Sequence, residues 1–197
     1  MSRISRLVVL VTSVAAVVGA MAGTASAVTW DVTSTGTFDA TAAPGTLSGA
    51  GDLTIVCQTT TATGSYTAGS FAGNTYSGLA GTVTFSNCSG PVPTETTCEY
   101  RFTATAQPVV TRTTTGNMDV TCAMKVASTG ALLCHISASP HTIYTDNVAV
   151  NTDTLTVTTT NVTTSGAGCP AGNPGTAHLS HLNFTVSGNG PHIIRTA

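Results

Sequence analysis

Hydrophobic and polar residues alternate with a period of two along most of the chain. In the segment 98–106 the even positions are apolar and the odd positions carry Glu, Arg or Thr. The segment 118–126 repeats the pattern, with Met118, Val120 and Met124 among its apolar positions. Because alternate side chains of an extended chain point to opposite faces, each segment predicts an antiparallel strand with one buried face.

Shorter rows predict further buried faces: Leu53, Ile55 and Cys57; Leu79, Val83 and Phe85; Leu132, Cys134 and Ile136; Leu155 and Val157; Leu182, Phe184 and Val186. Residues that favour turns separate the rows, at 43–45, 89–91, 139–140 and 166–175. No window shows the i, i+3, i+4 spacing of an amphipathic helix. The sequence therefore predicts an all-β fold, a single antiparallel β-sandwich or a barrel-like sheet.

The segment 151–164 is dominated by threonine, which favours extended backbone and tolerates water. We interpret it as a strand. Its threonines would form either an ordinary solvated outer face or a sheet edge that pairs with another chain.

The first 27 residues predict a secretory signal peptide. Arg3 and Arg6 precede an apolar run, and Ala25-Ser26-Ala27 provides the small residues at which signal peptidase cleaves. We expect cleavage between Ala27 and Val28. The mature protein would then be one threonine- and glycine-rich domain, residues 28–197, exported to the extracellular space or the cell surface.

The charge of the mature chain argues against nucleic acid as a partner. Six cationic residues, less Arg3 and Arg6, leave four Lys and Arg against eight Asp and Glu. Four scattered cations cannot neutralise a run of phosphates. No apolar segment after the signal is long enough to predict an integral membrane helix.

Six cysteines follow the predicted signal, at positions 57, 88, 98, 122, 134 and 169. In an oxidising compartment an even number indicates disulfides, and no CxxC spacing supports a metal or redox site. Spacing alone leaves 15 connectivities open. The apolar rows that contain Cys98 and Cys122 would allow these two residues to meet inside the sheet.

No arrangement of residues predicts catalysis, a cofactor or a metal site. His178 and His181 are three residues apart, which places them on opposite faces of a strand. His135 lies opposite an apolar row, as a surface histidine would. The motifs of serine hydrolases are absent, and the acidic residues are scattered over turns and polar faces without forming a pair. We therefore expect a protein that is not an enzyme.

Four aromatic residues are candidates for stacking on a ligand. Tyr66, Phe71 and Tyr76 recur at intervals of five in a Gly- and Ser-rich segment, and Trp30 lies near the mature N-terminus. Aromatic rings on such a loop can stack on sugars or apolar molecules. The alternative is that they fill the end of the core.

The mature chain resembles a group of small secreted actinobacterial proteins of uncharacterised function. The matching pieces are LTIVCQTTTATGSYTAG, GTVTFSNCSGP, NTDTLTV and GAGCPAGNPGTAHLSHLNFTVSG. The resemblance implies an all-β domain with the disulfides Cys57–Cys88 and Cys134–Cys169, and Cys98–Cys122 is an addition of this chain. The chain has AQPVV where those proteins often have Pro-Trp. The composition is also similar to that of secreted activators of alkane oxidation.

These observations support three hypotheses about function. The first is a non-catalytic extracellular or envelope protein whose threonine-rich faces mediate surface association or assembly. The second is a binding module for a polysaccharide or a hydrophobic ligand, and the third is a secreted enzyme with a dispersed site.

Overall fold

The computed structural model describes residues 28–49, 54–90, 93–107, 112–147, 152–169, 175–187 and 190–196. Every regular element in these ranges is a β-strand, and every pairing is antiparallel. The prediction of an all-β, antiparallel, disulfide-containing fold is confirmed. The predicted signal peptide up to Ala27, and Leu53, lie outside the described residues.

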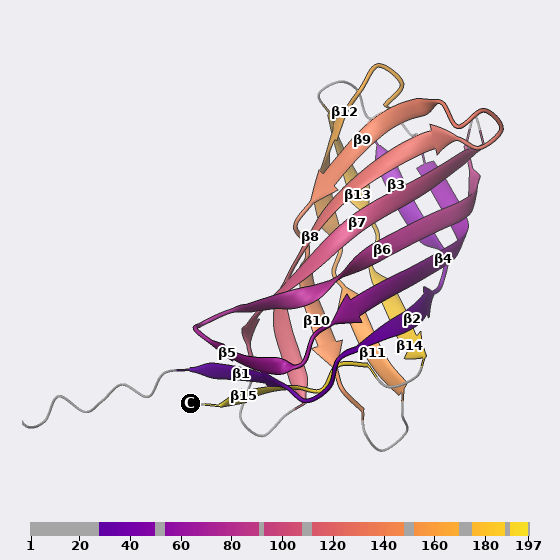
Figure 1. Cartoon of the computed structure of the whole chain (residues 1–197). Helices are drawn as coiled ribbons and strands as arrows, with labels where there is room; N and C mark the ends of the chain where they lie inside the picture. Colours follow the sequence, from indigo (N-terminus) through magenta and orange to yellow (C-terminus); the bar gives the residue numbers. More distant parts are fainter. Residues whose placement is uncertain are drawn as a thin grey trace, which may run out of the picture.

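Four long strands form one wall of the main sheet, and they run diagonally across the front of Figure 1. Each pairs with the next along the chain, so the wall is a meander. The four strands are β4 (Thr54–Tyr66), β6 (Tyr76–Ser89), β7 (Thr94–Ala106) and β8 (Thr113–Val126).

The opposite wall consists of four composite strands, each interrupted by two residues. The interruptions fall at 43–44, 139–140, 158–159 and 180–181, and together we call them the waist. The composite strands are β2 (Gly36–Ala42) with β3 (Gly45–Gly49), β9 (Leu132–Ala138) with β10 (His141–Thr145), β11 (Thr152–Val157) with β12 (Thr160–Ser165), and β13 (Gly175–Leu179) with β14 (Leu182–Ser187).

The two walls close into one continuous sheet. Strand β8 pairs with β9 above the waist and with β10 below it, while β4 pairs with β3 and β2 in the same way. Pairing of β13 with β3 and of β14 with β2 completes the ring. Of the two arrangements predicted, this pairing is that of the barrel-like sheet, with four long and four composite strands in chain order.

A separate three-stranded sheet lies at the lower end of the closed sheet in Figure 1. Its order is β15 (Ile193–Thr196), β1 (Thr29–Val32) and β5 (Gly69–Ala72). Trp30, at the centre of this sheet, is completely buried. Buried Gln107 joins the two sheets, because its Nε2 donates to Ile193 O (2.6 Å) and to Thr114 Oγ1 (3.1 Å).

The predicted rows face the interior of the closed sheet with two exceptions. Ala106, at the end of the row on β7, is exposed, because a β-bulge between Ala104 and Ala106 shifts the register with β8. Leu132 is 51% exposed, so the prediction that it faces inward is wrong. Leu132 pairs with Lys125 and Cys134 pairs with Met124, which leaves Leu133 as an extra residue in β9. This β-bulge turns Leu132 outward, and Leu133 packs against the core instead.

The threonine-rich segment forms two strands rather than one. Residues 152–157 form β11 below the waist, and residues 160–165 form β12 above it. Each has a hydrogen-bonded neighbour on both sides. The interpretation as a free sheet edge is therefore wrong for these strands, because closure of the sheet provides the second neighbour.

Candidate ligand-binding cavity

A cavity of about 70 Å³ lies inside the closed sheet, in the half above the waist. We call this half the cysteine half; it contains β3, β9, β12 and β13 and the facing parts of the four long strands. Every position of the closed sheet contributes to the lining. The aliphatic and aromatic lining residues are Leu47, Ile55, Val83, Phe85, Val120, Ile136, Ala138, Val157, Val162, Leu179, Leu182 and Phe184.

Sulfur forms a second part of the lining, from Cys57, Cys98, Met118, Cys122 and Met124. Gly45 and Pro140 line the cavity near the waist, and the hydroxyl-bearing lining residues are Thr46 and Thr96. Among the described residues, no charged side chain lines it. A polar group placed in such a space would lose its hydrogen bonds to water with little to replace them, so the chemistry favours apolar occupants.

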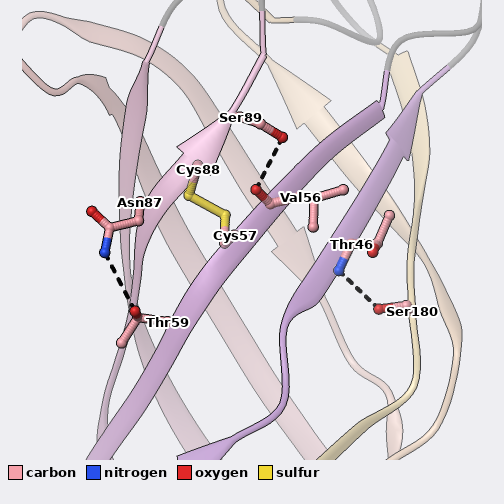
Figure 2. Close-up of a disulfide and its surroundings, with 8 residues drawn as sticks. All are labelled: Thr46, Val56, Cys57, Thr59, Asn87, Cys88, Ser89 and Ser180. Carbon is pink, nitrogen blue, oxygen red and sulfur yellow. Dashed lines mark hydrogen bonds between the residues drawn. A yellow bond between two sulfur atoms is a disulfide. The ribbon is translucent and has the colours of Figure 1, made fainter.

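The disulfide Cys57–Cys88 joins β4 to β6, as Figure 2 shows, and Cys57 lines the cavity. The two cysteines lie directly opposite each other in the sheet. Asn87 has a φ of 53° and lies within a register shift that turns Cys88 to the interior. Asparagine tolerates this left-handed conformation better than most residues, and its Nδ2 lies 3.4 Å from Thr59 Oγ1.

The other two disulfides also belong to the cysteine half. Cys98 and Cys122 are directly opposite on β7 and β8, and Cys134 of β9 is joined to Cys169, which follows β12. These are the three pairs that the sequence analysis favoured. The described residues contain no free cysteine.

In the half below the waist, the described side chains pack more closely. We call it the aromatic half; it contains β2, β10, β11 and β14 and the facing parts of the long strands. Its interior includes Phe38, Tyr144, Leu155 and Val186, and the gap between these side chains is too small for a water molecule. The floor of the cavity is therefore a closely packed core.

Most of the predicted ligand-stacking aromatics belong to this core. Trp30, Tyr66 and Tyr76 are at most 4% exposed, so the interpretation that they stack on an external ligand is wrong. Phe71 is half-buried, and its ring centroid lies 4.9 Å from that of Tyr76. Trp30 belongs to β1 and Phe71 to β5, and these strands pair with each other. The rings therefore fill the end of the core, as the alternative interpretation expected.

Two buried carboxylates form polar contacts at the lower end that the sequence analysis did not predict. Tyr144 donates to Asp153 Oδ2 (2.6 Å), and the Asn147 backbone N–H donates to Asp153 Oδ1 (2.9 Å). Burial raises the pKa of Tyr144, and the hydrogen bond to Asp153 raises this pKa further. Asp153 shares the inward positions of Leu155 and Val157, and this spacing was the signal that could have revealed its burial.

Asp146 ties the chain before β15 to the closed sheet. Its Oδ2 lies 2.7 Å from His192 Nδ1 and 3.5 Å from a terminal nitrogen of Arg112. The Thr33 backbone N–H donates to the His192 carbonyl (3.3 Å), which fixes the same segment from the other side. These contacts hold two chain segments together.

The remaining histidines are dispersed. His135, His178 and His181 are exposed on β9, on β13 and beside β14. His181 Nε2 lies 3.1 Å from Asn183 Oδ1. Within the described ranges, no three His, Cys, Asp or Glu side chains are arranged to hold a metal ion.

Within the same ranges, no helix has the length and apolar character needed to cross a membrane. Comparison with known proteins yields no match to a family model, a curated protein or a solved structure. The resemblance to secreted actinobacterial proteins therefore stays a prediction.

Proposed function

We propose that this protein is a secreted, non-catalytic binding protein that holds a small hydrophobic ligand inside the cysteine half. The observation that carries the proposal is the cavity of about 70 Å³, which residues from all eight strand positions of the sheet line. A closed sheet of eight strands is just wide enough either to be filled by side chains or to hold one small ligand. Here one half is filled and the other is not.

The lining chemistry supports this function. Transfer of a hydrocarbon from water into the cavity gains about 25 cal/mol for each Å² of apolar surface removed from water. Met118 and Met124 add adaptable contacts, because the methionine side chain is flexible and polarisable. Three disulfides are compatible with an extracellular or otherwise oxidising environment, where a carrier of apolar molecules needs a stable frame.

The test is to fill the cavity and measure binding of hexane to the oxidised protein by titration calorimetry. Ala138→Leu places a larger side chain in the lining, and Ala123→Leu makes the same change on β8 between two lining residues. Ala123 is outward-facing, so it is the matched control. We expect Ala138→Leu to reduce hexane affinity at least about tenfold and Ala123→Leu to leave it unchanged. Equal affinity in both variants would contradict the proposal.

A second candidate function is association with an extracellular surface through threonine. Six threonines from six adjacent strands lie directly opposite one another in a single row around the closed sheet: Thr154, Thr185, Thr41, Thr61, Thr84 and Thr97. All are exposed except Thr84, which is half-buried. This uncharged row of hydroxyl and methyl groups supports contact with a hydroxyl-rich polymer such as a cell-wall polysaccharide.

Co-sedimentation with purified cell wall, chitin and cellulose tests this second function. We expect saturable pelleting that Thr61→Glu with Thr97→Glu abolishes, because the added charges would need to be desolvated at the contact. Thr121→Glu with Thr176→Glu, at exposed positions outside the row, is the control and should pellet normally. Loss of pelleting in both double variants, or no pelleting of the original protein, would exclude the threonine row as the contact.

A further inference from the structure

Hydroxyl groups gather at one end of the cavity. Thr94 and Thr96 occupy successive inward positions on β7, above Cys98, and are 4% and 6% exposed. Thr96 lines the cavity, and Thr94 is the next inward residue toward the upper end of the sheet. The buried Thr94 Oγ1 has no hydrogen-bond partner among the described residues. A buried hydroxyl without a partner is costly, and a ligand oxygen nearby would remove that cost.

The opposite end of the cavity is hydrocarbon and thioether. Near the waist the lining includes Met118, Val157, Leu182 and Phe184, and below them lies the packed core of the aromatic half. Thr46 also lies near the waist, but it alternates with Gly45 and Leu47, which face the interior, so its side chain is directed to the outer face of the sheet. The cavity therefore has a polar end and an apolar end, and a ligand with one oxygen would adopt a single orientation in it.

We propose that the ligand is a slender, uncharged aliphatic chain with a single oxygen function, an alcohol or a carbonyl, held at Thr96 and Thr94. This inference rests on the proposed function, since it specifies the ligand of the same cavity. The hydrocarbon tail extends toward the waist. The hydroxyl of Thr96 is the specificity-determining group, because it is the buried hydroxyl side chain that lines the cavity.

The charge distribution favours a neutral ligand over a fatty acid anion. Glu95 and Lys125 lie opposite each other near Thr96, but both are exposed on the outer face of the sheet. Among the described lining residues there is no cation to compensate a carboxylate. Burial of an unpaired carboxylate costs far more than burial of an alcohol that finds a hydrogen bond.

The small volume and the flexible methionines of the lining together favour a chain over a ring. A dry apolar cavity of about 150 Å³ binds benzene, and the present cavity has about half that volume. A straight chain can occupy a narrow space and expand it through rotamer changes of Met118 and Met124, whereas a rigid ring requires its whole cross-section at once.

Titration calorimetry with ligands of equal chain length tests the inference on the full oxidised protein. The probes are hexane, hexan-1-ol and hexanoate, with benzene as the ring. We expect hexan-1-ol to bind about five to tenfold more tightly than hexane, as one hydrogen bond provides. We expect hexanoate to bind at least about a hundredfold more weakly than hexan-1-ol, and benzene more weakly than hexane.

Three variants locate the oxygen. Thr96→Val removes the hydroxyl at nearly constant volume and should abolish the preference for hexan-1-ol over hexane, while Thr96→Ser should keep it. Thr60→Val is the matched control, because Thr60 is 1% exposed and its Oγ1 also has no partner among the described residues, yet Thr60 does not line the cavity. Thermal unfolding of each variant verifies that the fold is retained.

The outcomes separate this inference from the proposed function. Binding of hexane without a preference for hexan-1-ol, hexanoate affinity equal to that of hexan-1-ol, or loss of the preference in Thr60→Val but not in Thr96→Val would overturn the inference and leave the proposed function standing. Failure of all four probes to bind would overturn the proposed function itself.

Discussion

The cysteine half and the aromatic half share the same long strands, yet they achieve stability by different means. The aromatic half is filled by large rings, with Phe102 completely buried and Tyr144 2% exposed. The cysteine half contains the cavity and all three disulfides. The difference indicates that covalent cross-links replace close packing where the interior is left open.

The approximate free energies of the cavity and of the disulfides support this difference between the two halves. An unfilled cavity costs about 24 cal/mol per Å³, so 70 Å³ corresponds to about 2 kcal/mol. A cross-link between residues separated by 24 positions, as in Cys98–Cys122, contributes about 3 kcal/mol in the chain-entropy model. One disulfide is therefore enough to offset the free-energy cost of the cavity. The cysteine half can remain stable while it keeps an open binding site.

Truncation of a buried leucine should give the largest difference in stability between the two halves. Leu155 in the aromatic half and Leu182 beside the cavity are each 3% exposed. We expect Leu155→Ala to reduce the free energy of unfolding by about 4 kcal/mol and Leu182→Ala by about 2 kcal/mol, because Leu182 already has a void on one side. Urea denaturation measures both, and equal losses would show that the halves are packed alike.

Removal of one cross-link should affect the cysteine half selectively. We expect Cys98→Ala with Cys122→Ala to lower the free energy of unfolding by about 3 kcal/mol. Hydrogen exchange should accelerate in β3, β9, β12 and β13 before it does in β2, β10, β11 and β14, since the remaining packing is weaker there. Uniform acceleration throughout the sheet would contradict the assignment of the disulfides to one half.

Replacement of a buried alanine by the larger leucine should also destabilise the aromatic half more than the cysteine half, here through overpacking. Ala104 is completely buried in the aromatic half, and we expect Ala104→Leu to cost about 2 kcal/mol through overpacking. Ala138 lines the cavity, so Ala138→Leu should change the free energy of unfolding by less than about 0.5 kcal/mol. Thermal unfolding of the two variants at neutral pH compares them directly, and a severe loss in Ala138→Leu would indicate that the cavity cannot accept a guest.

The smallest effect concerns alkaline pH. Burial raises the pKa values of Tyr76, Tyr100 and Tyr144 above their ordinary value of 10.0. The stability that comes from the neutral phenols is fully present below pH 10 and is lost as the pH rises above it, because the unfolded chain ionises first.

Tyr100→Phe removes one of these groups. At neutral pH it should cost about 1 kcal/mol, since Tyr100 donates to the Thr63 carbonyl (3.3 Å), and it should flatten the decline of stability above pH 10. Chemical denaturation at several alkaline pH values tests this, and an unchanged slope would show that another group controls the alkaline transition.

The alternation of apolar and polar residues was sufficient to predict the strands of both walls, because a period of two indicates a strand with one buried face. It failed at Leu132 and at Ala106, where β-bulges change the phase of the alternation. It also could not reveal that Thr152–Val157 and Thr160–Ser165 belong to opposite ends of one composite strand. Closure of the sheet depends on pairings between distant segments, and residue periodicity contains no information about them.

The candidate site was harder to predict than the fold. Met118, Val120 and Ile136 have the character of ordinary core residues, and only their arrangement shows that the space between them is empty. Tyr66 and Tyr76 lie in a Gly- and Ser-rich segment of the kind that forms binding loops, but both rings, like that of Trp30, are buried in the core. The type of a residue indicates whether it prefers to be buried. The volume of the cavity, by contrast, depends on the side chains from all the strands around the closed sheet.

The closure of the sheet also determines the order in which the protein can fold. Most neighbouring strands are joined by short connections, but the final seam joins segments far apart in sequence, as in the contact of Thr46 N with Ser180 Oγ, 134 residues away. The meander can therefore form early as an open sheet with two unpaired edges, and the seam forms last and slowly. Until it does, those edges can pair with a second chain, so dilute conditions should favour refolding to the monomer.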